Sequence, residues 1–240
     1  MQPYRGHAFV DWDDTVAENI RYFRETERQL AELIAAATNY DVTEIHHRGE
    51  ELDVAVARRM GLVKDSFSTA WTECYREFVG RAGVAADVGL LREIYQLCQI
   101  PYETLQEILP GAAETLTWLH AIGFEVTIWT AGEERIQKRK VQDSGLQTLI
   151  HRVEVTTVKS PERLLGALGG RDRSRAFVVG NSAHSDIQPA LAVGLPAFHI
   201  AVETWGYDKA KVDLDHPQYT RIESLAELPK RLEERFPIAL

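Results

Sequence analysis

The feature that most constrains this chain is the segment 9–16, where a short apolar run ends abruptly in acidic residues. Phe9 and Val10 are followed by Asp11 and Asp13, which alternate around Trp12 and would share one side of an extended backbone. Open α/β sheets bind their ligands at the carboxyl ends of their strands. Two carboxylates held close together repel each other, take up a proton or bind a cation. We therefore interpret this segment as a buried strand that delivers acids into a functional site.

Composition excludes several classes of protein. The formal net charge of the 240 residues is −9, which argues against nucleic-acid binding. Cys74 and Cys98 are the only cysteines and form no CxxC pair, which indicates a reducing compartment. No apolar run approaches the ~20 residues of a membrane span, and residues 1–7 lack the apolar centre of a signal peptide. We predict a soluble cytoplasmic protein that associates with no membrane and no nucleic acid.

After the first strand, the sequence shows only helical patterns as far as about residue 107. We expect helices at residues 18–37, 43–60, from about 65 onward, 87–99, and a short one before Pro110. Asp41 or Thr43 caps the second helix and Gly61 ends it. The third carries an aromatic stripe with helical spacing, which we interpret as the core of a helix bundle: Phe67, Trp71, Tyr75 and Phe78.

From Pro110 onward, helices and strands alternate. We expect strands at residues 124–129, 151–158, 176–179 and 197–202, and helices at 112–120, 133–143, 161–168, 186–193 and 222–236. Such alternation predicts a parallel sheet covered on both faces. The fold class is therefore α/β, a Rossmann-like parallel sheet core covered by helices, with an inserted all-helical cap domain. We place the core at residues 1–16 and 108–240 and the cap at 17–107, where an insert after the first strand is positioned as a lid.

Polar groups follow four of the predicted strands. They are Asp11-Trp12-Asp13-Asp14-Thr15, Thr130, Lys159-Ser160-Pro161, and Gly180-Asn181-Ser182-Ala183-His184-Ser185-Asp186. In order and spacing these segments resemble the four motifs of the haloacid dehalogenase superfamily of phosphatases, whose first motif reads DxDx[TV]. The helical insert between the first and second motifs is similar to the cap of the first subclass. The resemblance covers the whole chain.

The chemistry also follows from the residues. A carboxylate that attacks a phosphate ester must first have its charge repulsion removed, and a Mg²⁺ ion held by oxygen ligands does this. Asp11 is the candidate nucleophile, which forms an aspartyl-phosphate. Asp13 is the candidate general acid and then base, and burial beside another carboxylate is expected to raise its pKa.

The resemblance assigns the remaining roles. Thr130 and Ala131 with Lys159 bind the phosphoryl group, and the metal ligands are Asp11, Asp13 through its backbone carbonyl, Asp186 and Asn181. Many relatives carry an aspartate where this chain has Asn181, so Asp186 carries more of the charge, and which of the two ligates the metal stays open.

The sequence leaves the exact reaction undecided. We expect a Mg²⁺-dependent phosphatase for a small phosphorylated metabolite, of the sugar phosphate or nucleotide type. The alternatives are a phosphotransferase or mutase of the same fold and a non-catalytic regulatory relative. Asp13 argues against a dehalogenase, and an insert whose only lysine is Lys64 argues against a phosphonate-cleaving enzyme. The oligomeric state stays open.

Three further features are interpreted as structural. His46 and His47 are adjacent on a predicted helix and point about 100° apart, which favours surface histidines over metal ligands. The basic run Arg135, Lys138, Arg139 and Lys140 is interpreted as a solvated helix face. Residues 213–215 repeat the Asp-x-Asp spacing, but no strand precedes them, so we expect a loop.

Overall fold

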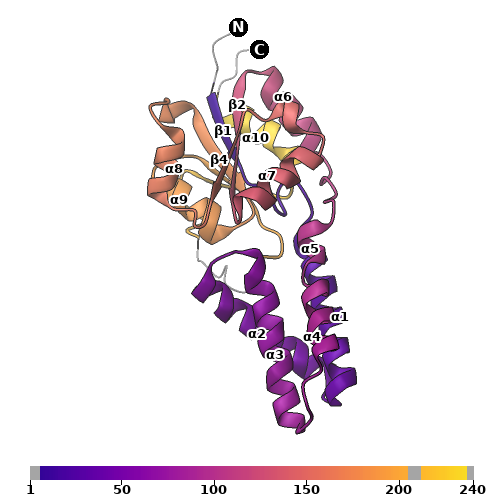
Figure 1. Cartoon of the computed structure of the whole chain (residues 1–240). Coiled ribbons are helices and arrows are strands. Elements are labelled where there is room, and N and C mark those ends of the chain that lie inside the picture. Colours follow the sequence, from indigo (N-terminus) through magenta and orange to yellow (C-terminus); the bar gives the residue numbers. More distant parts are fainter. Residues whose placement is uncertain (1–5, 205–211, 237–240) are drawn as a thin grey trace. The chain divides into compact units, whose positions relative to one another are not determined.

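The computed structural model describes residues 6–204 and 212–236 (Figure 1). Residues 1–5, part of the segment considered above for a targeting signal, lie outside the described residues. The chain divides into two compact units, one of residues 1–18 and 105–240 and the other Asn19–Thr104. The first contains the sheet, and the second is helical.

The sheet is parallel and has six described strands in the order β3-β2-β1-β4-β5-β6. Their bounds are β1 (Gly6–Val10), β2 (Phe124–Ala131), β3 (Arg152–Thr156), β4 (Ala176–Gly180), β5 (Ala197–Ile200) and β6 (Tyr219–Ile222). The first strand is central, with Phe9 opposite Thr127 on one side and Val178 on the other. Five strands were predicted, and all five are confirmed. The sixth, β6, was not predicted, and the helix expected from residue 222 begins only at Leu228.

Helices cover both faces of this sheet (Figure 1). They are α6 (Ala112–Ala121), α7 (Glu134–Asp143), α8 (Pro161–Leu168), α9 (Gln188–Ala192) and α10 (Leu228–Arg235). Ala8 and Val10 pack with residues of α6, α7 and α10, whereas Phe9 packs with residues of α8 and α9. The alternation of side chains along β1 thus divides the apolar core into two layers. This is the Rossmann-like α/β fold expected from the sequence.

The helical unit contains α1 (Ile20–Thr38), α2 (Val42–Met60), α3 (Lys64–Ala82), α4 (Val88–Leu97) and α5 (Ile100–Glu103). The Asp41 carboxylate caps α2 by accepting from the backbone N–H groups of Thr43 (2.9 Å) and Glu44 (3.1 Å), and Gly61 ends it with φ +85°. The aromatic stripe of α3 is buried, and Phe67 packs edge-on against Phe23 of α1 at 5.1 Å between ring centroids. The predicted bundle core is confirmed.

Candidate active site

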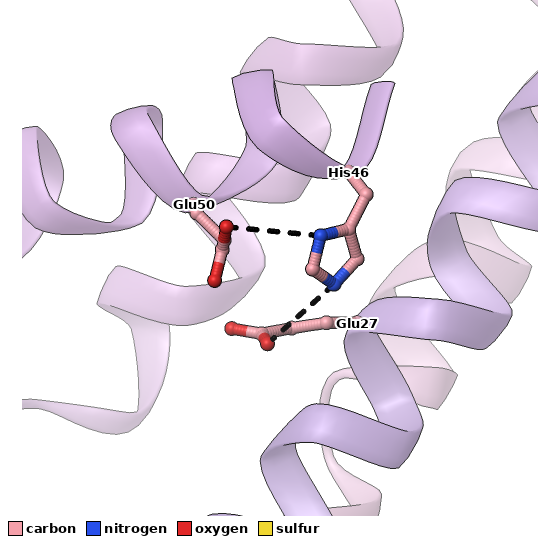
Figure 2. Close-up of side chains that lie close together, drawn as sticks. All are labelled: Glu27, His46 and Glu50. Carbon is pink, nitrogen blue, oxygen red and sulfur yellow. Dashed lines mark ion pairs between the residues drawn. The ribbon is translucent and has the colours of Figure 1, made fainter. Parts of the chain in front are cut away.

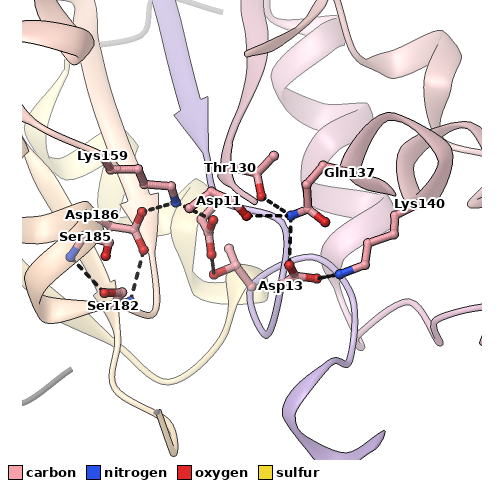
Figure 3. A network of polar contacts seen from close by, with 11 residues as sticks. Asp11, Asp13, Thr130, Gln137, Lys140, Lys159, Ser182, Ser185 and Asp186 are labelled. Atoms are coloured by element: carbon pink, nitrogen blue, oxygen red, sulfur yellow. Dashed lines mark hydrogen bonds and ion pairs between the residues drawn. The ribbon is translucent and has the colours of Figure 1, made fainter. Parts of the chain in front are cut away.

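The predicted site residues meet at the carboxyl edge of the sheet (Figure 3). Asp11 directly follows β1, Thr130 lies in the last part of β2, Lys159 follows β3, and Asn181 directly follows β4. These strands are parallel and neighbouring, so their carboxyl ends lie at one edge. The edge is built within the unit that contains the sheet.

The Lys159 ammonium group joins two carboxylates. Its Nζ lies 2.5 Å from Oδ1 of Asp11 and 2.5 Å from Oδ1 of Asp186, and all three side chains are buried. The Thr15 hydroxyl donates to the other oxygen of Asp11 at 3.3 Å. The same ammonium group lies 5.2 Å from the ring centroid of Trp129, a cation–π contact. One cation thus faces two anions at the end of β1.

This arrangement changes the acidity of the groups involved. Burial, and next the negative charge of Asp186, raise the pKa of Asp11 to about 7, against the opposing effect of Lys159. Burial would lower the pKa of Lys159, but the two carboxylates raise it above its ordinary value. Lys159 therefore keeps its charge. The positive charge of Lys159 is not enough to stabilise the ionised form of Asp11 against burial and the neighbouring Asp186 carboxylate.

Asp13 lies in a different environment. Its Oδ1 accepts from Lys140 Nζ at 2.7 Å and from Gln106 Nε2 at 2.9 Å, and its Oδ2 accepts from Gln137 Nε2 at 2.9 Å. Burial would raise the pKa of Asp13, but Lys140 and the two amides together hold it below its ordinary value. The expectation that Asp13 has a raised pKa is therefore wrong, and the raised pKa belongs to Asp11.

The donors around Asp13 were missed in the sequence. Lys140 was assigned to a solvated basic face, yet its side chain is only 7% exposed. Gln137 and Lys140 are three residues apart in α7, the helix that begins shortly after Thr130, and therefore lie on one helix face. Their place in the helix that follows a motif strand was the available signal. Gln106 lies in a connecting segment without a periodic pattern.

Thr130 is buried beside Gln137. The amide Nε2 of Gln137 donates to Thr130 Oγ1 at 2.5 Å and to the Ala131 carbonyl at 3.1 Å. Because the Thr130 oxygen already accepts from Gln137, its own O–H can donate to another acceptor. The hydroxyl is thus suited to contact an anionic oxygen at the edge of the sheet.

Asp186 is fully buried and lies in a π-helical turn, Ala183–Ile187. Its Oδ2 accepts from the backbone N–H of Ser182 at 3.0 Å, and the Ser182 hydroxyl accepts from the backbone N–H of Ser185 at 2.8 Å. A Cβ on Gly180 would lie 2.3 Å from this same Oδ2. The glycine of the motif therefore provides the space that the Asp186 carboxylate fills.

Asn181 is buried next to this turn, but its side chain makes no hydrogen bond with any described residue. Its backbone carbonyl contacts Nε2 of His199 at 3.1 Å. Asp186, rather than Asn181, thus shares the Lys159 ammonium group with Asp11.

The donor set is suited to a hard divalent cation. Asp11, Asp13 and Asp186 supply three carboxylates against the two ammonium groups of Lys140 and Lys159. Carboxylate and carbonyl oxygens are the ligands that Mg²⁺ prefers. The raised pKa of Asp11 marks a carboxylate that an added cation would stabilise. The residues present therefore fit a magnesium ion.

A second group of ionisable side chains lies in the helical unit (Figure 2). Ligand atoms of Glu27, His46 and Glu50 lie within 4.8 Å of one another. Arg24 already joins the two carboxylates, at 2.8 Å from Glu27 and 2.6 Å from Glu50. His47 is exposed and faces Glu51 instead. We interpret this group as an ion-pair network between α1 and α2.

The fold and the site together define a Rossmann-like α/β protein with buried acids and a lysine at the carboxyl edge of its sheet. Comparison with protein families gives a match to the haloacid dehalogenase-like hydrolases over residues 7–194. The chain belongs to this family and is a hydrolase of the haloacid dehalogenase superfamily. Comparison with curated proteins gave no sequence match.

Solved structures share this fold. A haloacid dehalogenase-like family hydrolase from Xanthomonas campestris is 21% identical, with a TM-score of 0.79 over 97% of this chain and 96% of its own. A HAD-hydrolase from Bacillus subtilis bound to magnesium is 20% identical, with a TM-score of 0.62 over 96% and 99%. A HAD phosphatase from Thermococcus onnurineus is 19% identical, with a TM-score of 0.59 over 95% and 97%. None of the described helices is long and apolar enough to cross a membrane.

Proposed function

We propose that this hydrolase is a Mg²⁺-dependent phosphatase that acts on a small phosphorylated metabolite, of the sugar phosphate or nucleotide type, through an aspartyl-phosphate. The observation that carries the proposal is that the two acids of the first motif have different hydrogen-bond partners. Asp11 shares the Lys159 ammonium group with Asp186, while Asp13, two residues away, is held by a separate set of donors. Acids with different environments are what a nucleophile and a proton-transfer group require.

Asp11 is the nucleophile in this proposal. Its Oδ attacks phosphorus while the bond from phosphorus to the leaving oxygen breaks. Lys159, 2.5 Å away, offsets negative charge on Asp11 and on the phosphoryl group. The Thr130 hydroxyl and the segment at Ala131 hold phosphoryl oxygens, since Gln137 leaves the Thr130 O–H available as a donor.

Asp13 is the proton-transfer group. Asp13 first takes up a proton from solvent. In the first step its carboxyl gives this proton to the leaving oxygen, and in the second its carboxylate takes a proton from the water that attacks the aspartyl-phosphate. The ionised form, favoured by Lys140, is the form that the second step requires. A dehalogenase needs no proton for its halide leaving group, so Asp13 also favours a phosphate ester as substrate.

Mg²⁺ is the cofactor in this proposal, held by Asp11, Asp186 and the backbone carbonyl of Asp13, with Asn181 as a further neutral ligand. When bound, it reduces repulsion between Asp11 and the substrate and polarises the phosphoryl group. We assign the helical residues 17–107 the role of a cap that selects the leaving group. Both cysteines, Cys74 and Cys98, are buried free thiols, which favours the reducing cytoplasm as the compartment.

Hydrolysis of para-nitrophenyl phosphate by the purified chain tests the proposal. We expect activity with Mg²⁺, loss of activity with a chelator, and restoration when Mg²⁺ is added back. Asp11→Asn should lower kcat by at least ~10³-fold, because the attacking oxygen is lost. A matched control is Asp215→Asn, in the exposed loop that repeats the Asp-x-Asp spacing, which should keep wild-type activity.

Two further measurements separate the alternatives. Acid quenching during turnover, followed by peptide mass spectrometry, should find one phosphoryl group on the peptide that contains Asp11. Released phosphate should equal released para-nitrophenol, whereas transfer to an added sugar hydroxyl would indicate a phosphotransferase. A wild-type chain that hydrolyses neither this ester nor a panel of sugar phosphates and nucleotides would contradict the proposed function.

A further inference from the structure

We propose that Lys140 is a positioning residue that directs the Asp13 carboxyl toward the leaving group. This inference rests on the proposed function and goes beyond the residues that the sequence motifs supply. Lys140 lies outside all four motifs, in the second half of α7, and was expected on a solvated face. Its ammonium group instead contacts Asp13 at 2.7 Å (Figure 3).

Three donors fix the Asp13 carboxyl from different segments of the chain. Gln106 accepts from the indole N–H of Trp12 at 2.8 Å, which orients its amide so that Nε2 faces Asp13 Oδ1. Gln137 donates from α7 to Asp13 Oδ2 and also to Thr130. Lys140 supplies the one charged donor of this set. The three contacts leave the carboxyl little freedom to rotate.

The charge of Lys140 has a specific use in the proposed reaction. As the Asp11 oxygen bonds to phosphorus, the bond to the leaving oxygen breaks and the Asp13 proton moves to that oxygen. Asp13 becomes negative as the proton leaves, and the neighbouring ammonium group stabilises the charge that develops. Lys140 faces Asp13, whereas Lys159 faces Asp11 and Asp186, so each lysine serves a different acid.

A neighbouring lysine of the same helix shows what an ordinary surface position looks like. Lys138 is 54% exposed and pairs with Glu134, one turn away and 71% exposed, at 2.5 Å. Lys140 is 7% exposed and reaches a residue 127 positions away in the sequence. The two lysines therefore form a matched pair for mutation.

The role of Lys140 is tested with two esters of similar size and different leaving groups. Phenyl phosphate releases a poor leaving group that needs the proton, and para-nitrophenyl phosphate releases a good one that hardly needs it. Lys140→Met should lower kcat/KM roughly 100-fold for phenyl phosphate and less than about threefold for the nitrophenyl ester. Lys140→Arg should keep most of the activity toward phenyl phosphate, and Lys138→Met should leave kcat/KM unchanged for both esters.

A second comparison remains informative if Lys140→Met alone fails to fold. The single variant Asp13→Asn removes one partner of the ion pair. The double variant Asp13→Asn/Lys140→Met removes both partners, so it has no unpaired buried charge. If Lys140 acts through Asp13, the two should have the same kcat/KM within about twofold for either ester. A further loss in the double variant, or an equal loss on both esters from Lys140→Met, would overturn the proposal. A wild-type chain that hydrolyses neither ester would overturn the proposed function itself.

Discussion

At the residue scale, Gly180 shapes the acidic site because it has no side chain. A Cβ at this position would lie 2.3 Å from Oδ2 and 2.4 Å from Cγ of Asp186. Asp186 is fully buried and holds Lys159, which in turn holds Asp11. A methyl group on Gly180 would therefore displace a carboxylate and, through it, the lysine beside the proposed nucleophile.

We predict that Gly180→Ala lowers both stability and activity. Overpacking of a closed site costs about 1–3 kcal/mol of unfolding free energy. Misplacement of catalytic groups by about an ångström lowers the rate by roughly 100-fold. Urea unfolding and para-nitrophenyl phosphate hydrolysis measure the two effects. The control is Gly166→Ala in α8, where a Cβ meets nothing within 4 Å; it should keep activity and stabilise by up to about 1 kcal/mol.

At the residue scale, some of the site could be predicted from the sequence and some could not. Asp11, Thr130, Lys159 and Asp186 follow strands with clear apolar patterns, so their meeting at one edge could be predicted. The inward direction of Lys140 could not, because α7 carries several basic residues and its amphipathic pattern does not say which of them reaches into the site. The low pKa of Asp13 escaped prediction for the same reason, since it depends on those donors.

At the element scale, the missed strand has a physical explanation. The strand β6 is a four-residue edge strand in which only Ile222 is buried, so it shows no alternating apolar pattern. Its pairing with β5, from Ala197 opposite Tyr219 to Ile200 opposite Ile222, is a long-range contact that local sequence does not record. The longer helices α1 to α3 have enough turns for their periodicity to locate them within about two residues.

The α1–α2 interface gives a prediction about pH. Asp53 in α2 is 9% exposed, and burial raises its pKa from 3.8 to about 7, with Glu27 and Glu50 adding to the rise and Arg24 opposing it. Between these pH values the folded state holds a proton that the unfolded state releases, so stability falls as pH rises. Above pH ~7 the full loss is about 4 kcal/mol.

Asp53→Asn should remove this loss. We expect the variant to be more stable than the wild type at pH 8, with a gain that shrinks steadily as the pH falls from about 7 and is lost below 3.8, where Asp53 is protonated in both states. Urea unfolding of the full chain at several pH values measures the difference. Asp65→Asn, an exposed acid in the first turn of α3, serves as the control and should show no comparable pH dependence. A gain for Asp53→Asn that is constant with pH would contradict the assignment.

At the scale of the whole molecule, the connections between the two units are paired with each other. The Glu18 N–H donates to the Glu107 carbonyl at 2.8 Å, and the Leu109 N–H donates to the Val16 carbonyl at 2.9 Å. Ala17 forms an antiparallel bridge with Ile108. The chain thus leaves and re-enters the sheet-containing unit at adjacent positions. The two apolar clusters on the faces of the sheet contain no residue of the segment Asn19–Thr104.

We therefore propose that the units are separate folding domains, and we predict that the sheet-containing unit folds without the helical one. Replacement of Asn19–Thr104 by a short Gly/Ser turn closes a gap that the paired connections already hold together, so the loop-closure cost is small. The shortened chain should unfold cooperatively in urea, with an m-value reduced in proportion to the surface removed. Circular dichroism should show a lower helix content with the sheet signal retained. A broad, non-cooperative transition with binding of a hydrophobic dye would show instead that the sheet requires the helical insert. The apolar faces of the sheet would then need packing from the insert, although neither apolar cluster contains a residue of Asn19–Thr104.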